Sequence, residues 1–258
     1  LALRKELNLF ANIRPIAVPD ALLPLSPVKE AIVQGTDFVV VRELTSGIYF
    51  GEPRELGVSE AYDTCRYTVQ EITRIAKIAF DIAMTRKKHV TSVDKANVLA
   101  TSKLWRQTVE TVAQDYPEVT LTHQLVDSCA MRIVQQPTEF DVILTENLFG
   151  DILSDEASVL PGTLGVLPSA SHSDSGVSLY EPIHGSAPDI AGQNIANPAS
   201  MILSAVLMLR QSFDLPDLAD QIESAVYHVM NEGIVTGDLG GKATTSEFTQ
   251  AVITALGK

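Results

Sequence analysis

The sequence predicts an α/β fold, because short apolar segments that suit buried strands alternate with longer segments of helical period. The predicted strands are residues 38–41, 89–93, 119–126 and 142–144. The predicted helices are residues 1–9, 61–86, 97–115, 128–134, 147–159, 199–213, 218–232 and 246–256. Pro198 and Pro216 each stand just before a helix, where a missing N–H costs little.

Residues 160–185 differ in composition from the rest of the chain. They are rich in Gly, Pro and Ser and show little hydrophobic periodicity, so we expect a segment that crosses between subdomains. Short strands are expected there around Val166 and Val177.

Composition excludes several classes of protein. The 258 residues carry a net charge of -13, and no basic stripe is present that would bind nucleic acid. No segment approaches the ~20 apolar residues of a membrane span. Cys65 and Cys129 are not closely spaced, which argues against a disulfide framework or a thiolate zinc site and fits a reducing cytoplasm. Each is expected to be a small buried hydrophobe.

Three arginines lie near predicted element ends: Arg4, Arg14 and Arg42. Arg42 follows an apolar strand and precedes Glu43, so a surface salt bridge is one interpretation. The guanidinium fork also matches carboxylate geometry, and three such groups would bind a dicarboxylate. Spacing alone leaves both interpretations open.

Asp151 and Asp155 are four residues apart on a predicted helix and therefore share one face. They fit either a solvated acidic face or a site for Mg²⁺ or Mn²⁺, which prefer oxygen ligands. The apolar neighbours of these residues favour the second interpretation, since buried carboxylates need partners. Asp127 follows a strand and is either a helix N-cap or a site residue.

Two further residues have chemistry that suits proton transfer. Lys95 follows the strand at 89–93 and would act as a base if its pKa were lowered. Tyr49 would act as an acid. Taken alone, each also fits a structural role.

A loop of small residues spans 181–192. The backbone N–H groups of Gly185, Ser186 and Ala187 suit a phosphate, and Asp189 suits ribose hydroxyls. The loop lacks the Gly-x-Gly-x-x-Gly pattern, so spacing alone fits a plain turn equally well.

Taken together, these segments resemble the β-decarboxylating dehydrogenases, the family of isocitrate and 3-isopropylmalate dehydrogenases. The resemblance runs from Leu1 to about Gly241 and is carried by residues 3–5, 10–15, 41–53, 92–99, 147–156 and 184–198. It implies an isocitrate/isopropylmalate dehydrogenase-like fold with two α/β subdomains. Residues 1–13 and 161–258 would form an incomplete cofactor-binding domain, and 14–160 the domain for substrate, metal and dimer contacts.

The resemblance also implies a role for each candidate. Substrate carboxylates would bind Arg4, Arg14 and Arg42, and the cation would bind Asp127, Asp151 and Asp155. Lys95 would assist removal of the hydroxyl proton, and Tyr49 would protonate the enolate. Lys95 and Asp127 would act in the site of the other subunit of an obligate homodimer. The NAD ligands would be Glu181, His184, Gly185, Ser186, Ala187, Asp189 and Asn197, with Asp238 as a further candidate.

Asp189 predicts NAD rather than NADP, because a carboxylate repels a 2′-phosphate. NADP-dependent relatives have lysine and tyrosine at the positions of Asp189 and Ile190. Leu1 and Val98 resemble part of an apolar pocket for an isopropyl group. The implied reaction is oxidative decarboxylation of 3-isopropylmalate to 2-oxoisocaproate in leucine synthesis, with isocitrate, homoisocitrate or tartrate as alternative substrates.

The family carries a longer N-terminal region, including a first strand and a glycine-rich turn that contact the cofactor. We therefore expect the first strands of the nucleotide domain to be missing here and activity of this chain alone to be incomplete. A non-catalytic dimerising fragment, folded from about Arg14 to Leu160, is the alternative of a different class.

Overall fold

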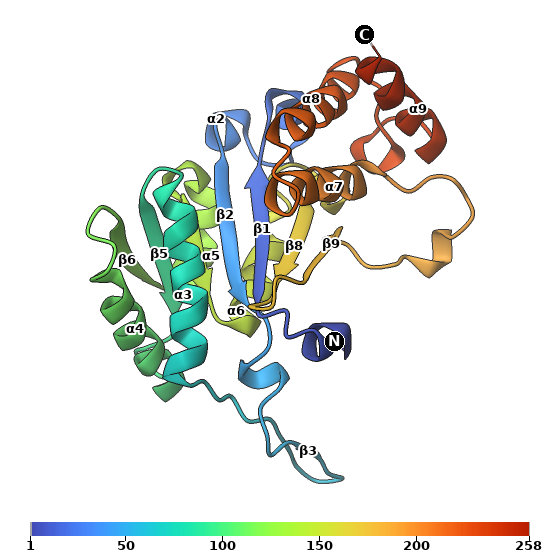
Figure 1. The fold of residues 1–258 in the computed structure, drawn as a ribbon. Coiled ribbons are helices and arrows are strands. Elements are labelled where there is room, and N and C mark those ends of the chain that lie inside the picture. The colour runs from blue at the N-terminus through green and yellow to red at the C-terminus, as the bar shows by residue number, and fades with distance from the viewer. Residues whose placement is uncertain (1, 258) are drawn as a thin grey trace. The chain divides into compact units, whose positions relative to one another are not determined.

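The computed structural model describes residues 2–257. Its helices are α1 (Ala2–Glu6), α2 (Glu30–Val33), α3 (Val69–Met84), α4 (Ala100–Ala113), α5 (Val126–Gln135), α6 (Asn147–Ala157), α7 (Ala199–Gln211), α8 (Pro216–Asn231) and α9 (Thr245–Leu256). Its strands are β1 (Ala11–Ala17), β2 (Asp37–Glu43), β3 (Glu55–Leu56), β4 (Ala61–Tyr62), β5 (His89–Asp94), β6 (Thr120–Leu125), β7 (Val142–Thr145), β8 (Pro168–His172) and β9 (Ser178–Pro182). The α/β class is confirmed (Figure 1).

The chain divides into two compact units. The first comprises Leu1–Ile13, Phe38–Glu156 and Ser171–Val177, and the second Arg14–Asp37, Ala157–Ala170 and Ser178–Lys258. Residues 1–13 and 14–37 are thus grouped differently from the expected domains. The functional division at residues 13 and 160 stays a prediction.

The first unit is built on parallel strands. Within the seven-stranded order β6-β5-β7-β2-β1-β8-β9, strand β7 pairs in parallel with both β5 and β2. Arg42 on β2 is level with Thr145 on β7, so both strands end at the same edge. Polar side chains that follow these ends are therefore brought together, as is usual in open α/β sheets.

Helix α3 covers this sheet in Figure 1 and shows why the local sequence folds as it does. Thr68 and Glu71 form a capping box that fixes its first turn. Its buried residues recur every three or four positions: Ile72, Ile75, Ala76, Ala79, Phe80 and Ala83. The predicted helix at 61–86 is therefore wrong for residues 61–68, where β4 pairs with β3 and the capping box sets a later start.

Other predicted boundaries also need correction. Strand β1 was not predicted, because Pro15 and two polar residues interrupt its apolar pattern. The first helix ends at Glu6 rather than at residue 9, and Asn8 has a positive φ of 48° that stops it. Val166 lies in a 3-10 turn and the strands begin just after the expected places, at Pro168 and Ser178.

The second unit contains α7, α8 and α9, which pack in sequence order, and α7 also packs on β9. A second capping box, Thr244 with Glu247, begins α9. In the other unit, Cys129 is buried, as expected, whereas Cys65 is only half-buried; both are free thiols. Among the helices of residues 2–257, none has the length and apolarity to cross a membrane.

Candidate functional site

Arg42 is the centre of the first cluster. It is the penultimate residue of β2, and its side chain is only 1% exposed. Its Nη1 donates to Asp151 Oδ1 at 2.5 Å, while Nε and Nη2 both donate to Asn147 Oδ1, at 3.2 and 2.7 Å. Burial lowers the pKa of Arg42 and the Asp151 carboxylate opposes that effect. The alternative of a surface salt bridge with Glu43 is wrong, because both side chains are buried.

Tyr49 joins the same cluster from the 3-10 turn Gly47–Tyr49. Its hydroxyl donates to Asp151 Oδ2 at 2.5 Å, and the Arg42 guanidinium lies 5.6 Å from its ring centroid. Partial burial raises the pKa of Tyr49, and the hydrogen bond to Asp151 raises it further. The phenol is therefore held protonated, which suits a proton donor.

The other two arginines have different surroundings. Arg4, at the third position of α1, is half-buried and lies near enough to Arg42 to lower the Arg42 pKa. Like charges that approach each other in this way are typical of a site for an anion. Arg14 is buried in β1 and belongs to the second compact unit.

Lys95 and Asp127 are brought together within one chain. Lys95 Nζ lies 2.9 Å from Asp127 Oδ1, and this contact is the main reason why the Asp127 pKa is lowered. Asp127 is in the first turn of α5 and Leu125 is the N-cap, so the N-cap interpretation of Asp127 is wrong. Val98, on the following segment, is 64% exposed, and Leu1 lies outside the described residues.

Asp155 is exposed on α6, one turn after Asp151. Among residues 2–257, no three His, Cys, Asp or Glu side chains gather as a metal site would require. Two oxygen donors one helical turn apart suit Mg²⁺ or Mn²⁺ but leave coordination to be completed from elsewhere. The donor chemistry fits a cation that is shared with a second chain or with substrate.

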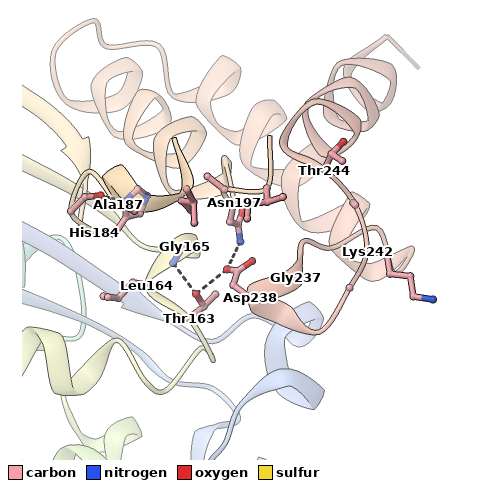
Figure 2. Close-up of a pocket in the computed structure, with 16 residues that line it drawn as sticks. Thr163, Leu164, Gly165, His184, Ala187, Asn197, Gly237, Asp238, Lys242 and Thr244 are labelled. Atoms are coloured by element: carbon pink, nitrogen blue, oxygen red, sulfur yellow. Dashed lines mark hydrogen bonds between the residues drawn. The ribbon is translucent and has the colours of Figure 1, made fainter. Parts of the chain in front are cut away.

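A cavity of about 820 Å³ lies in the second unit (Figure 2). Its volume falls within the range of small-molecule sites. Asp238 is one of its lining residues and accepts hydrogen bonds from Thr163 Oγ1 at 2.9 Å, Asn197 Nδ2 at 3.0 Å and Thr236 Oγ1 at 2.5 Å. A Cβ added to Gly237 would meet nothing within 4 Å, so the backbone there is open to the cavity.

The structure places several of the expected NAD ligands on this cavity. The predicted residues that line it are His184, Gly185, Ala187, Asn197 and Asp238. Ala187 has a φ of 40°, which turns the loop ahead of the 3-10 turn Pro188–Ile190. Glu181, Ser186 and Asp189 are not among the lining residues, although Ile190 next to Asp189 is. The lining fits a nucleotide that contacts the loop and Asp238 together.

Two residues of these clusters are not predicted as site residues from the sequence. The sequence pattern places Asn147 at the start of a helix and Thr163 in a crossing segment. Asn147 lies two residues after Thr145, the last residue of β7, and this position near a strand end is a signal for a site residue. Thr163 had no such signal, because its importance depends on a contact with a residue 75 positions away.

Comparison with known proteins identifies the family. The family model described as isocitrate/isopropylmalate dehydrogenase matches residues 1–252. The chain belongs to this family. A 3-isopropylmalate dehydrogenase from Listeria monocytogenes is 63% identical over 98% of the chain and 72% of the relative. One from Streptococcus thermophilus is 63% identical over 99% of the chain and 74% of the relative.

Solved structures agree with this family. Isocitrate dehydrogenase from Methylococcus capsulatus matches all of the chain and 76% of its own length, with a TM-score of 0.90 and 38% identity. The TT0538 protein from Thermus thermophilus matches with the same TM-score and identity over 52% of its length. The expected isocitrate/isopropylmalate dehydrogenase-like fold is confirmed, and the chain is that of an oxidoreductase.

Proposed function

We propose that this protein catalyses the NAD-dependent oxidative decarboxylation of 3-isopropylmalate to 2-oxoisocaproate, with Mg²⁺ or Mn²⁺, in the leucine pathway of the cytoplasm. The names of the relatives at 63% identity support this substrate over isocitrate, whose dehydrogenase is 38% identical. The observation that carries the proposal is the cluster in which Arg42, Tyr49 and Asp151 meet.

Each charged group of this cluster has a role in the proposed reaction. Arg42, with Arg4 and Arg14, binds the two substrate carboxylates, because guanidinium groups match their geometry. Asp151 and Asp155, with Asp127 of a second subunit, hold the divalent cation. When bound, that cation polarises the 2-hydroxyl and stabilises negative charge on oxygen during loss of CO₂.

Two residues move protons. Lys95 would accept the proton of the substrate hydroxyl, directly or through water, in the oxidation for which bound NAD would supply the hydride acceptor. Its ion pair with Asp127 keeps both side chains at one place on the surface of this unit. Tyr49 then supplies a proton to the carbon that has lost CO₂, and its raised pKa keeps that proton available at neutral pH.

A homodimer is part of the proposal. The cation has two donors on α6, so Asp127 and Lys95 of a second subunit complete the site. Exposed apolar side chains favour burial by such a partner: Leu56 and Val58 in the β3–β4 arm, Met131 and Val134 on α5, and Ile152 on α6. A two-stranded arm alone is marginally stable, which also favours a partner.

The cavity around Asp238 is proposed to hold NAD. Small residues and the turn at Ala187 let the backbone approach the nucleotide, and Asn197 and Asp238 offer polar contacts. Asp189, exposed beside the lining residue Ile190, accepts hydrogen bonds from ribose hydroxyls and repels a 2′-phosphate. Glu181 and Ser186 complete the proposed set.

A substrate panel tests the reaction. The protein, expressed with any residues that precede Leu1 in its gene, is assayed for NADH formation with Mn²⁺ and 3-isopropylmalate, isocitrate, homoisocitrate or tartrate. The highest kcat/KM is expected for 3-isopropylmalate with NAD. A higher value for another diacid would refute the substrate assignment. If the double substitution Asp189→Lys and Ile190→Tyr left the NAD/NADP preference unchanged, the role of Asp189 would be wrong.

A further inference from the structure

The guanidinium group of Arg42 is held in place by Asn147. Asn147, the first residue of α6, is 0% exposed, and its Oδ1 accepts from both Nε and Nη2 of Arg42. A single oxygen thereby bridges one whole edge of the guanidinium group. That contact is independent of Asp151, which meets the group at Nη1.

Asn147 is itself held on two sides. Its Nδ2 donates to the carbonyl oxygen of Ser46 at 3.0 Å, and its backbone N–H donates to the Tyr67 hydroxyl at 2.9 Å. Tyr67 is 6% exposed and packs edge-on against Trp105, with ring centroids 5.6 Å apart. The Asn147 amide therefore cannot turn without leaving buried polar groups unpaired, which is costly.

Gly150 shapes the same contact from the next turn of α6. A Cβ at this position would lie 2.6 Å from Arg42 Cγ and 2.9 Å from Arg42 Cβ. The stem of Arg42 thus passes directly over a helix position that has no side chain. Gly150 sets the path of the stem, and Asn147 sets the rotation of the group at its end.

The orientation follows from counting donors. A guanidinium group has five N–H bonds. Two of them go to Asn147 and one to Asp151, which leaves one on each terminal nitrogen with no partner among the described residues. The edge formed by Nη1 and Nη2 matches the two oxygens of a carboxylate.

We propose that Asn147 is a positioning residue, which turns the Nη1/Nη2 edge of Arg42 toward a substrate carboxylate. This inference rests on the proposed function of Arg42 as a substrate ligand. It deepens that function, because it says which edge of the group recognises the diacid and which residue selects that edge.

Steady-state kinetics test the role of Asn147. Asn147→Ala is expected to raise KM for the diacid about tenfold, with a smaller change in kcat and with the NAD affinity unchanged, since the lost interaction orients a binding group. Asn147→Asp keeps an acceptor for Arg42 and is expected to recover part of this loss. The matched control is Asn12→Ala. It removes the buried hydrogen bond that Asn12 Nδ2 donates to Ser171 Oγ in the same unit and leaves the contacts of Arg42 in place.

A second measurement does not depend on turnover. The ¹⁵N NMR signal of the Arg42 Nε–H, identified by its loss in Arg42→Lys, is expected to exchange slowly with water in the parent protein and in Asn12→Ala. In Asn147→Ala it is expected to exchange fast or disappear. A protected signal in Asn147→Ala, or a KM increase no larger than that of Asn12→Ala, would overturn the inference. If the parent protein oxidised none of the diacids, the function would fail, while the NMR result would still decide the position of Arg42.

Discussion

In the clusters around Asp151 and Asp238, an aspartate accepts hydrogen bonds from several side chains, but the surroundings of the two aspartates differ. Asp151 accepts hydrogen bonds from Tyr49 and from the buried guanidinium group of Arg42. Asp238 accepts from Thr163, Asn197 and Thr236, which are neutral, and it borders a cavity of about 820 Å³. A metal ion at the first cluster would therefore compete with the hydrogen bonds that Arg42 and Tyr49 already donate to Asp151, whereas a nucleotide enters space that is already open.

Arg42→Ala should have the largest effect, because it leaves Asp151 and Asn147 without the guanidinium group that donates to both of them. It also removes the proposed ligand of a substrate carboxylate. Loss of one partner of a buried, hydrogen-bonded charge pair between a protein and its ligand typically costs about 2–5 kcal/mol, so kcat/KM for the diacid should fall at least about a hundredfold. Steady-state kinetics check this. The control Arg86→Ala breaks an ion pair with the buried Asp141 and should lower stability while sparing kcat/KM. Equal kinetic losses in both variants would contradict the central role of Arg42.

Gly150→Ala should follow in size. The added Cβ would lie 2.2 Å from Thr145 Oγ1 and 2.6 Å from Arg42 Cγ, so side chains must shift. Overpacking of this kind costs about 1–3 kcal/mol. Thermal unfolding should show that loss and kinetics a raised KM for the diacid, with NAD affinity intact. An unchanged melting temperature would mean that the Arg42 stem does not pass over this helix position.

Asp238→Ala should have a smaller effect, confined to the cofactor. Three donors lose their acceptor, but they lie beside an open cavity where water can replace it. The dissociation constant for NAD, measured by fluorescence titration, should rise about three- to tenfold. The exposed residue Asp217, on α8, gives the control Asp217→Ala, which should leave NAD binding unchanged.

Glu146→Gln should have the smallest effect, which is confined to the pH dependence of the free energy of unfolding. Burial raises the pKa of Glu146 above its ordinary value of 4.5, so the folded protein holds this proton more tightly than the unfolded chain. The contribution of protonated Glu146 to stability is fully present below pH 4.5 and is lost as the pH rises through the pKa of the folded state. The variant should flatten this part of the pH dependence of the free energy of unfolding.

Glu71→Gln is the control, because the pKa of Glu71 is shifted in the opposite direction to that of Glu146. Burial of Glu71 is outweighed by hydrogen bonds from Ser46 and Thr68, and its pKa is lowered. Its contribution is present above the ordinary value and is lost as pH falls through the folded pKa. If both variants changed the curve in the same direction, the assignment of either group would be wrong.

The α/β class and most helices were predictable because they depend on local pattern. The period of 69–84 and the apolar strand at 142–145 needed no distant partner. Strand β1 was not predictable, since Asn12, Arg14 and Pro15 hide its buried face. Spacing on α6 indicated that Asp151 and Asp155 share a face. The contacts of Arg42 with Asn147 and Asp151 join residues more than a hundred positions apart, which only the parallel pairing of β2 and β7 explains.

Subunit mixing tests the account most directly. Asp127→Ala and Asp151→Ala proteins, each inactive alone, are unfolded together and refolded, so that mixed dimers contain one site with all three carboxylates. About a quarter of parental activity is expected, because half of the dimers are mixed and each has one intact site. The control pair, Asp151→Ala with Asp155→Ala, has no intact site in any dimer and should stay inactive. No recovery in the first mixture, or equal recovery in both, would contradict a cation site shared between two chains.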